Sequence, residues 1–174
     1  MEAFAVSNFE LMVRLTIAVI LGLIIGSERS RVGKRAGMRT YALVSLGACL
    51  FIVMSGVVSA MYAETFTFDP LRVASQIVVG IGFLGAGVIF VQKNELTGLT
   101  TAAGLWVVAA IGATCGYGLY AIATYVTFLT LFIFEALWYF EERFVRIADK
   151  TPLQELSEEV LKAKKPTQHH EDES

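Results

Sequence analysis

The chain contains 174 residues, of which 55% are hydrophobic and only 17% carry a charge, and its formal net charge is −2. A soluble domain usually has about 25% charged residues, and a nearly neutral chain offers little electrostatic field to attract nucleic acid. Two cysteines are too few for a disulfide framework. These values exclude a disordered chain, a disulfide-rich scaffold and a nucleic-acid-binding protein, and they predict an integral membrane protein.

Five segments are long and apolar enough to cross a bilayer, which takes about 20 mostly apolar residues. None of them shows the alternation typical of a membrane β-strand, and a helix satisfies every backbone polar group within itself. The expected fold class is therefore an all-α membrane protein, a bundle of five transmembrane helices. The five segments are residues 9–26, 40–62, 73–91, 99–115 and 119–140.

Basic residues indicate the direction of these segments, because cytoplasmic loops are enriched in lysine and arginine. The loop after the first segment holds five basic residues against one acid, whereas the next loop holds two acids and one base. Three more basic residues follow the fifth segment. The pattern predicts an outside N-terminus and an inside C-terminus.

The last part of the chain is predicted to form a separate region, with a transmembrane domain over residues 1–140 and a short cytoplasmic tail over 141–174. Thr151 and Pro152 are typical of a helix start, and an apolar stripe follows them. This helix is expected to lie on the membrane surface or on a partner chain, or to be only weakly ordered. The polar residues after Pro166 are expected to be disordered.

Glycines are concentrated in particular segments. Small residues four apart let helices approach closely in lipid, although glycine is also common in membrane helices generally. The third segment contains GIGFLGAG, and this density predicts a helix at the centre of the bundle, contacted from several sides. The glycines predicted to pack helices are Gly22, Gly26, Gly80, Gly82, Gly85, Gly87, Gly112 and Gly116.

Two polar clusters are predicted, one at each membrane face. Arg14 follows Glu10 by four residues, so the two can pair, and Arg72 and Gln76 begin the third segment at the same outer level. The alternative for this outer cluster is snorkelling to the headgroups. The inner cluster lies where two helices begin with free N–H groups; its alternative is ordinary capping and positive-inside topology. The inner cluster consists of Glu28, Arg29, Arg39, Thr40, Asn94, Thr100 and Thr101.

No set of residues typical of an enzyme occurs. Both histidines lie in the tail, outside every membrane segment and loop, and no spacing typical of a metal or cofactor site was found. Cys49 and Cys115 lie inside apolar stretches and are predicted to be small buried thiols. We therefore expect a protein without catalytic residues, cofactor or metal site.

Three strings resemble the signatures of the MgtC/SapB family of bacterial inner-membrane proteins. They are IGSERSRVGKRAGMRTYALVSLGA, RVASQIVVGIGFLGAGVIF and NELTGLTTAAGLWVVAAIG, and they occur in the family's order. The resemblance implies a multi-pass, five-helix module in the cytoplasmic membrane. It also implies links to growth in low magnesium, to survival inside host phagocytes and to control of other membrane proteins such as the ATP synthase. Many members carry a soluble regulatory domain after the helices, and the 34 residues that follow Phe140 would make this chain a short form.

Two functions follow as hypotheses. The first is a regulator that binds a second copy of itself or another membrane protein within the lipid bilayer through glycine-rich helices. The alternative is a transporter or channel for Mg²⁺ or another small ion. Magnesium prefers hard oxygen ligands, and the segments offer only Glu10 and Glu135 near their ends, together with carbonyl groups that glycines expose.

Overall fold

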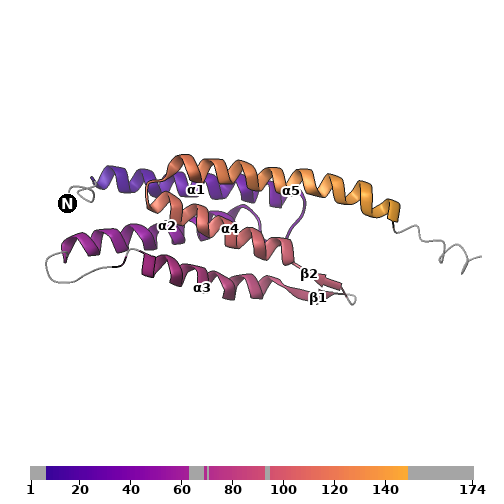
Figure 1. Ribbon diagram of the computed structural model, residues 1–174, viewed down its shortest axis with the longest axis horizontal. Coiled ribbons are helices and arrows are strands. Elements are labelled where there is room, and N and C mark those ends of the chain that lie inside the picture. The colour runs from indigo at the N-terminus through magenta and orange to yellow at the C-terminus, as the bar shows by residue number, and fades with distance from the viewer. Residues whose placement is uncertain (1–6, 63–68, 70, 93–94, 149–174) are drawn as a thin grey trace, which may run out of the picture. The chain divides into compact units, whose positions relative to one another are not determined.

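The computed structural model describes residues 7–62, 69, 71–92 and 95–148, with side chains described as far as Ala136. This part of the chain forms five helices and one two-stranded hairpin (Figure 1). In chain order they are α1 (Asn8–Arg31), α2 (Met38–Met61), α3 (Leu71–Val88), β1 (Phe90–Gln92), β2 (Glu95–Thr97), α4 (Leu99–Gly116) and α5 (Tyr120–Ala148).

Helices dominate, as predicted, and α1 to α4 are each long and apolar enough to cross a membrane. In α5 the apolar stretch is shorter and covers Tyr120–Ala136. Five spans and the outside N-terminus therefore remain predictions, while a multi-pass membrane protein is supported by four helices.

The hairpin is a departure from the all-α prediction. The third segment was expected to stay helical to residue 91, but α3 ends at Val88, and Phe90 pairs with Thr97 in an antiparallel ladder. The run Ile89-Phe90-Val91 is rich in residues that favour strands. Gly98 then adopts φ 93°, a left-handed conformation that only glycine enters readily, and this turn starts α4.

Side-chain caps fix the starts of three helices. The Ser7 hydroxyl accepts from the Glu10 amide at the start of α1, and the Ser30 hydroxyl accepts from the Met38 amide, 3.1 Å away, at the start of α2. At α3, a carboxylate oxygen of Asp69 accepts from the Leu71 amide at 2.9 Å. These short polar side chains satisfy amides that have no partner within the helix.

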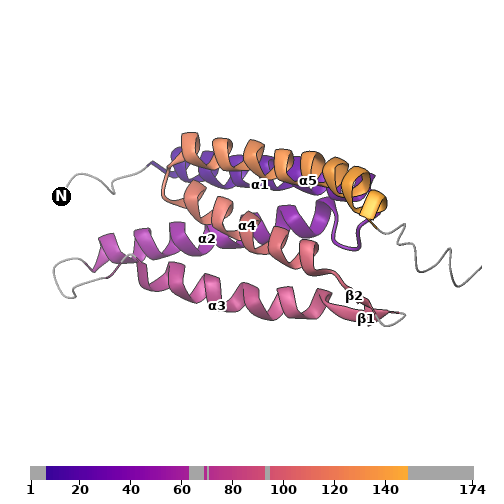
Figure 2. The same cartoon turned by 45° about the vertical axis from the view of Figure 1, so that its right-hand side comes forward.

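The bundle formed by α1 to α4 has two inner helices, α4, half of which is buried, and α2. Helix α2 packs along α1 on one side and along α4 on the other, and α1 also contacts α4 (Figures 1 and 2). Tyr41, Ser45 and Cys49, all on α2, are completely buried.

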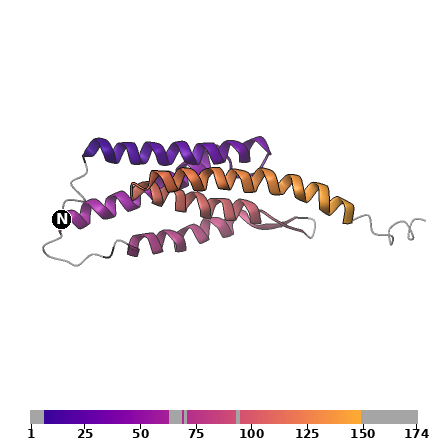
Figure 3. The same ribbon diagram turned by 45° about the horizontal axis from the view of Figure 1, so that its top comes forward.

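The prediction that the glycine-rich third segment occupies the centre is wrong. α3 packs along α4 and only lightly against α2, and it lies at one edge of the four helices (Figure 3). Among its residues only Ile81 and Gly85 are buried. The segment with the highest density of glycine therefore forms an outer helix of the four.

The chain divides into two compact units, residues 1–132 and 133–174, with the division inside α5. The first unit includes the start of α5, where Ala123, Thr127 and Thr130 are buried. The hydroxyl groups of both threonines donate to carbonyls four residues earlier, so each of these two buried hydroxyls has an acceptor. In the second unit residues 133–148 are helical, and the tail helix predicted from Thr151 lies outside the described residues.

Candidate functional site

A buried ion pair lies in the last turn of α1. Glu28 and Arg29 are 5% and 3% exposed, and the Arg29 Nη2 donates to Glu28 Oε1 at 2.6 Å while Nε donates to Oε2. Neighbouring residues of a helix usually point in different directions, but here the long arginine folds back on the carboxylate. Removing either residue would break a buried ion pair, which is costly in a low-dielectric interior.

Tyr41 joins this ion pair to α4. It is fully buried on α2 and within electrostatic range of both Glu28 and Arg29, and its hydroxyl donates a long hydrogen bond of 3.4 Å to the Thr101 carbonyl. Three helices therefore meet around one tyrosine. Tyr41 was not predicted as a site residue, because it stands at the start of an apolar run and carries no charge.

The predicted inner cluster is only partly assembled. Its members Glu28, Arg29 and Thr101 are buried, whereas Arg39, Thr40 and Thr100 are exposed. Asn94 lies outside the described residues. The buried members contribute to helix packing, and the exposed ones follow the pattern expected of helix starts.

An unpredicted contact at the same end connects the loop between α1 and α2 to the hairpin. The guanidinium carbon of Arg35, in the α1–α2 connection, lies 3.8 Å from the centroid of the Phe90 ring in β1. A cation over an aromatic face is attracted by the ring's negative face. The sequence offered no signal for this pair, since 55 positions separate the two residues.

At the opposite end Arg14 connects α1 to the end of α4. The side chain is 9% exposed, and it donates from Nη1 to the Gly116 carbonyl and from Nη2 to Glu10, each at 2.7 Å. A cation at the C-terminus of a helix satisfies an unpaired carbonyl and the negative end of the dipole. The predicted Glu10–Arg14 pair is confirmed, and the arginine does not snorkel.

The other two members of the outer cluster lie apart from this contact. Arg72 and Gln76 are exposed on α3, and in the described part of the chain neither forms a hydrogen bond or ion pair with Arg14. Nearby, burial raises the pKa of the Tyr117 phenol, and the charge of Asp69 raises it further.

Four predicted glycines lie where backbones touch. A Cβ atom at Gly22 or Gly26 would lie 2.8 Å or 2.6 Å from α2 backbone atoms. At Gly112 it would lie 2.1 Å from the Ser45 carbonyl oxygen, and at Gly116 it would lie 2.7 Å from Ile52. Glycine pairs on α1 and α4 thus hold α2 from two sides, as the four-residue spacing predicts.

The glycines of α3 behave differently. Gly85 would make only an ordinary contact with Ala102, 3.7 Å away, and a Cβ at Gly80, Gly82 or Gly87 would meet nothing within 4 Å. These three positions are exposed. No packing within the described residues explains why they are glycine.

Ser45 is a packing residue that the sequence analysis missed. Its buried hydroxyl donates to the Ala18 carbonyl at 2.7 Å, so it ties α1 to α2 directly opposite Gly112. A polar or small residue every fourth position (Tyr41, Ser45, Cys49) was the available signal. Cys49 and Cys115 are buried free thiols, as predicted.

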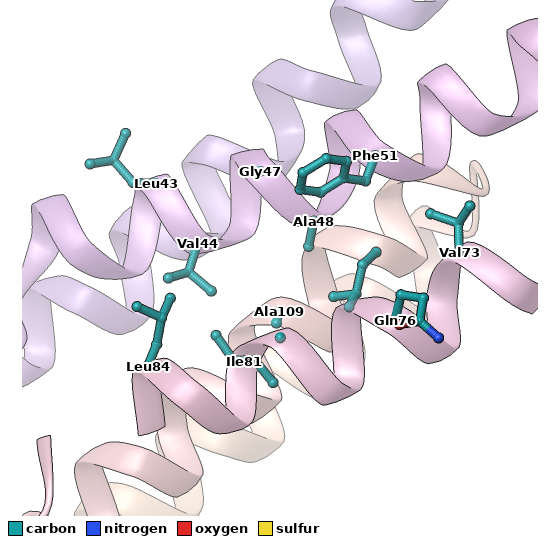
Figure 4. A pocket seen from close by; sticks show the side chains of 12 residues that line it. Leu43, Val44, Gly47, Ala48, Phe51, Val73, Gln76, Ile81, Leu84 and Ala109 are labelled. Atoms are coloured by element: carbon teal, nitrogen blue, oxygen red, sulfur yellow. The ribbon is translucent and has the colours of Figure 1, made fainter. Parts of the chain in front are cut away.

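A cavity of about 540 Å³ lies between α2 and α3, with Ala109 of α4 also lining it (Figure 4). We call it the α2–α3 groove. Gln76 is the single lining residue with a polar side chain. The lining residues are Leu43, Val44, Gly47, Ala48, Phe51, Val73, Gln76, Ile77, Gly80, Ile81, Leu84 and Ala109.

The family model for the MgtC family matches residues 15–143. The chain belongs to the MgtC family. MgtC-family relatives include YhiD of Escherichia coli (strain K12), named as a proposed magnesium transporter, which is 42% identical over 128 residues, 72% of this chain and 60% of YhiD. Protein MgtC of Brucella abortus (strain 2308) is 48% identical over 63% of this chain and 44% of its own length. Protein MgtC of Salmonella typhimurium (strain 14028s) is 44% identical over 71% and 50%.

This MgtC-family chain thus matches less than two thirds of the length of each of these relatives. No solved structure matches it. Among the described residues no group of three or more histidine, cysteine, aspartate or glutamate side chains is placed to hold a metal ion. The buried charges of this family member bind each other or a helix end, while large apolar side chains face outward.

Proposed function

We propose that this MgtC-family chain is a non-enzymatic protein of magnesium homeostasis and growth in low magnesium, which acts by binding and regulating other membrane proteins. We place it in the bacterial cytoplasmic membrane, with a second copy or another membrane protein as its partner. The family and the names of the relatives support the connection to magnesium.

One observation carries the proposed mode of action: α3 turns a strip of small residues outward. Ser75, Gly82 and Ala86 are exposed on the same face of the helix, beside Phe83, which is 81% exposed. Gly82 and Ala86 have the four-residue spacing that lets another helix approach closely in lipid. Each glycine in a helix also costs about 1 kcal/mol relative to alanine, and no contact within the described residues offsets that cost.

Photocrosslinking in cells tests this proposal. A photoreactive phenylalanine analogue at Phe83 should give a defined adduct with a membrane protein, whereas the same group at Ile20, an exposed residue of α1, should not. Gly82→Leu should remove the Phe83 adduct and the ability of the gene to support growth in low magnesium. An adduct and growth that are both unaffected by Gly82→Leu would contradict the proposal.

A transporter or channel for Mg²⁺ is the second candidate, favoured by the name given to YhiD. Purified protein in proteoliposomes separates the two. Flux of Mg²⁺ that depends on the protein would support transport, and its absence, together with the crosslink, would support the regulator.

A further inference from the structure

The α2–α3 groove is an apolar space that the fold leaves open. α3 packs on α4 but only lightly on α2, so the two helices diverge over a cavity of about 540 Å³. Glycines stand on both walls, Gly47 on α2 and Gly80 on α3, and a Cβ atom at either position would meet nothing within 4 Å. An empty apolar space of this size would forfeit van der Waals contacts along its whole lining.

The one polar side chain that lines the groove, that of Gln76, lies at one end of it. Val73 and Gln76 lie at the same end as Phe51, and Leu43 and Leu84 lie at the other (Figure 4). Val73 and Leu84, the first and last lining residues on α3, are eleven residues apart, so the groove extends about 16 Å along α3. Arg72 precedes Gln76 by one helical turn on the same face, which places it just beyond the polar end of the groove.

The position of Arg72 along α3 sets the depth of its charge in the membrane. α3 and α4 each have 18 residues and are therefore about 27 Å long, close to the thickness of the hydrocarbon layer, about 30 Å. Arg72, the second residue of α3, therefore lies at a membrane boundary, where phosphate groups are found. It is exposed, and among the described residues it forms no ion pair, since the neighbouring Asp69 carboxylate caps α3 instead.

We infer that the α2–α3 groove binds one acyl chain of an anionic phospholipid, with the lipid phosphate held by Arg72 and Gln76. The apolar groove with its open glycines matches the acyl chain of such a lipid. The Arg72 cation at a membrane boundary matches its phosphate. A transmembrane helix fits less well. Its apolar surface would match the walls of the groove but would leave the exposed Arg72 cation without an anionic partner.

Native mass spectrometry of the purified full chain, with added phosphatidylglycerol or phosphatidylcholine of identical acyl chains, tests this inference. One tightly bound phosphatidylglycerol per chain is expected. Gly80→Leu should weaken it at least tenfold by filling the groove, and Gly47→Leu repeats the test from the opposite wall. Gly82→Leu is the matched control, because Gly82 is equally open but does not line the groove.

The headgroup is tested separately. Arg72→Gln should weaken phosphatidylglycerol about fivefold, since one basic residue near an anionic surface has about this effect, and should reduce the preference over phosphatidylcholine. Lys34→Gln, an exposed cation outside the groove, is the control. In a Gly80→Leu background Arg72→Gln should have no further effect, because both act on the same lipid.

Three results would overturn the inference: no tight lipid on the unmodified chain, unchanged binding in both groove variants, or groove variants that dissociate a dimer while lipid binding stays the same. The last would identify a second copy as the occupant. The inference is independent of the proposed regulatory function, because Gly82→Leu probes the outward face of α3 and the groove variants do not.

Discussion

Replacing Gly112 by alanine should separate α2 from α4. The added Cβ would lie 2.1 Å from the Ser45 carbonyl oxygen, whereas ordinary contacts begin at 3.4 Å. The two helices must therefore move apart by roughly 1.3 Å, which is enough to lose about half of the van der Waals attraction across the contact. Neither atom can rotate away, since both belong to helix backbones. Overpacking of this kind costs about 1–3 kcal/mol, and we expect a value near 3 kcal/mol.

Unfolding in mixed micelles of increasing SDS content, followed by far-ultraviolet circular dichroism, measures this effect. Gly47→Ala is the matched control, because it makes the same chemical change in α2, where a Cβ meets nothing within 4 Å. It should be neutral or stabilise by up to about 1 kcal/mol through helix propensity. Gly112→Ala should unfold at a clearly lower SDS fraction. If both variants unfold together with the unmodified chain, the close approach of α2 and α4 is refuted.

Three further predictions use the same unfolding measurement. Gly98→Ala should destabilise by more than about 2 kcal/mol, because φ is 93° and a Cβ would lie 2.0 Å from the last carbonyl of α3; an unchanged midpoint would contradict the turn. Glu28→Gln should cost about 3–5 kcal/mol because it removes the carboxylate that pairs with the buried Arg29, and the added change Arg29→Met should recover most of that loss. Arg14→Met should cost about 1.5–3 kcal/mol, since it removes a charge-assisted hydrogen bond to the end of α4. Glu10→Gln should cost less than about 1 kcal/mol because Glu10 is half exposed; equal effects of these last two changes would argue against the α4 contact.

Regular spacing was the most informative signal in the sequence. Glycine pairs four residues apart predicted close helix contacts in α1 and α4, because a helix face must be small for backbones to touch, and the structure shows that both pairs contact α2. The denser glycines of the third segment do not form a single packing face within the described residues. The central position predicted from them was wrong. Glu10 and Arg14 could be paired from sequence because both lie on one helix.

Contacts between distant segments could not be predicted. The Arg35–Phe90 contact and the Tyr41–Thr101 hydrogen bond depend on how the helices are placed in three dimensions. The hairpin after α3 was missed because its strand residues continue an apolar run and resemble the end of a transmembrane helix. The four-residue spacing that includes Ser45 was visible, but a lone serine in an apolar segment carries no indication of its partner.

The hydrogen bond from Arg14 to Gly116 joins residues 102 positions apart, and this separation has a consequence for biosynthesis. At about 5–20 residues per second, the ribosome makes the acceptor roughly 5–20 s after the arginine. During that interval α1 enters the bilayer with its guanidinium group already present and the final acceptor not yet made. Glu10, one turn away, is available from the start, so this carboxylate can neutralise the arginine until the fourth helix arrives.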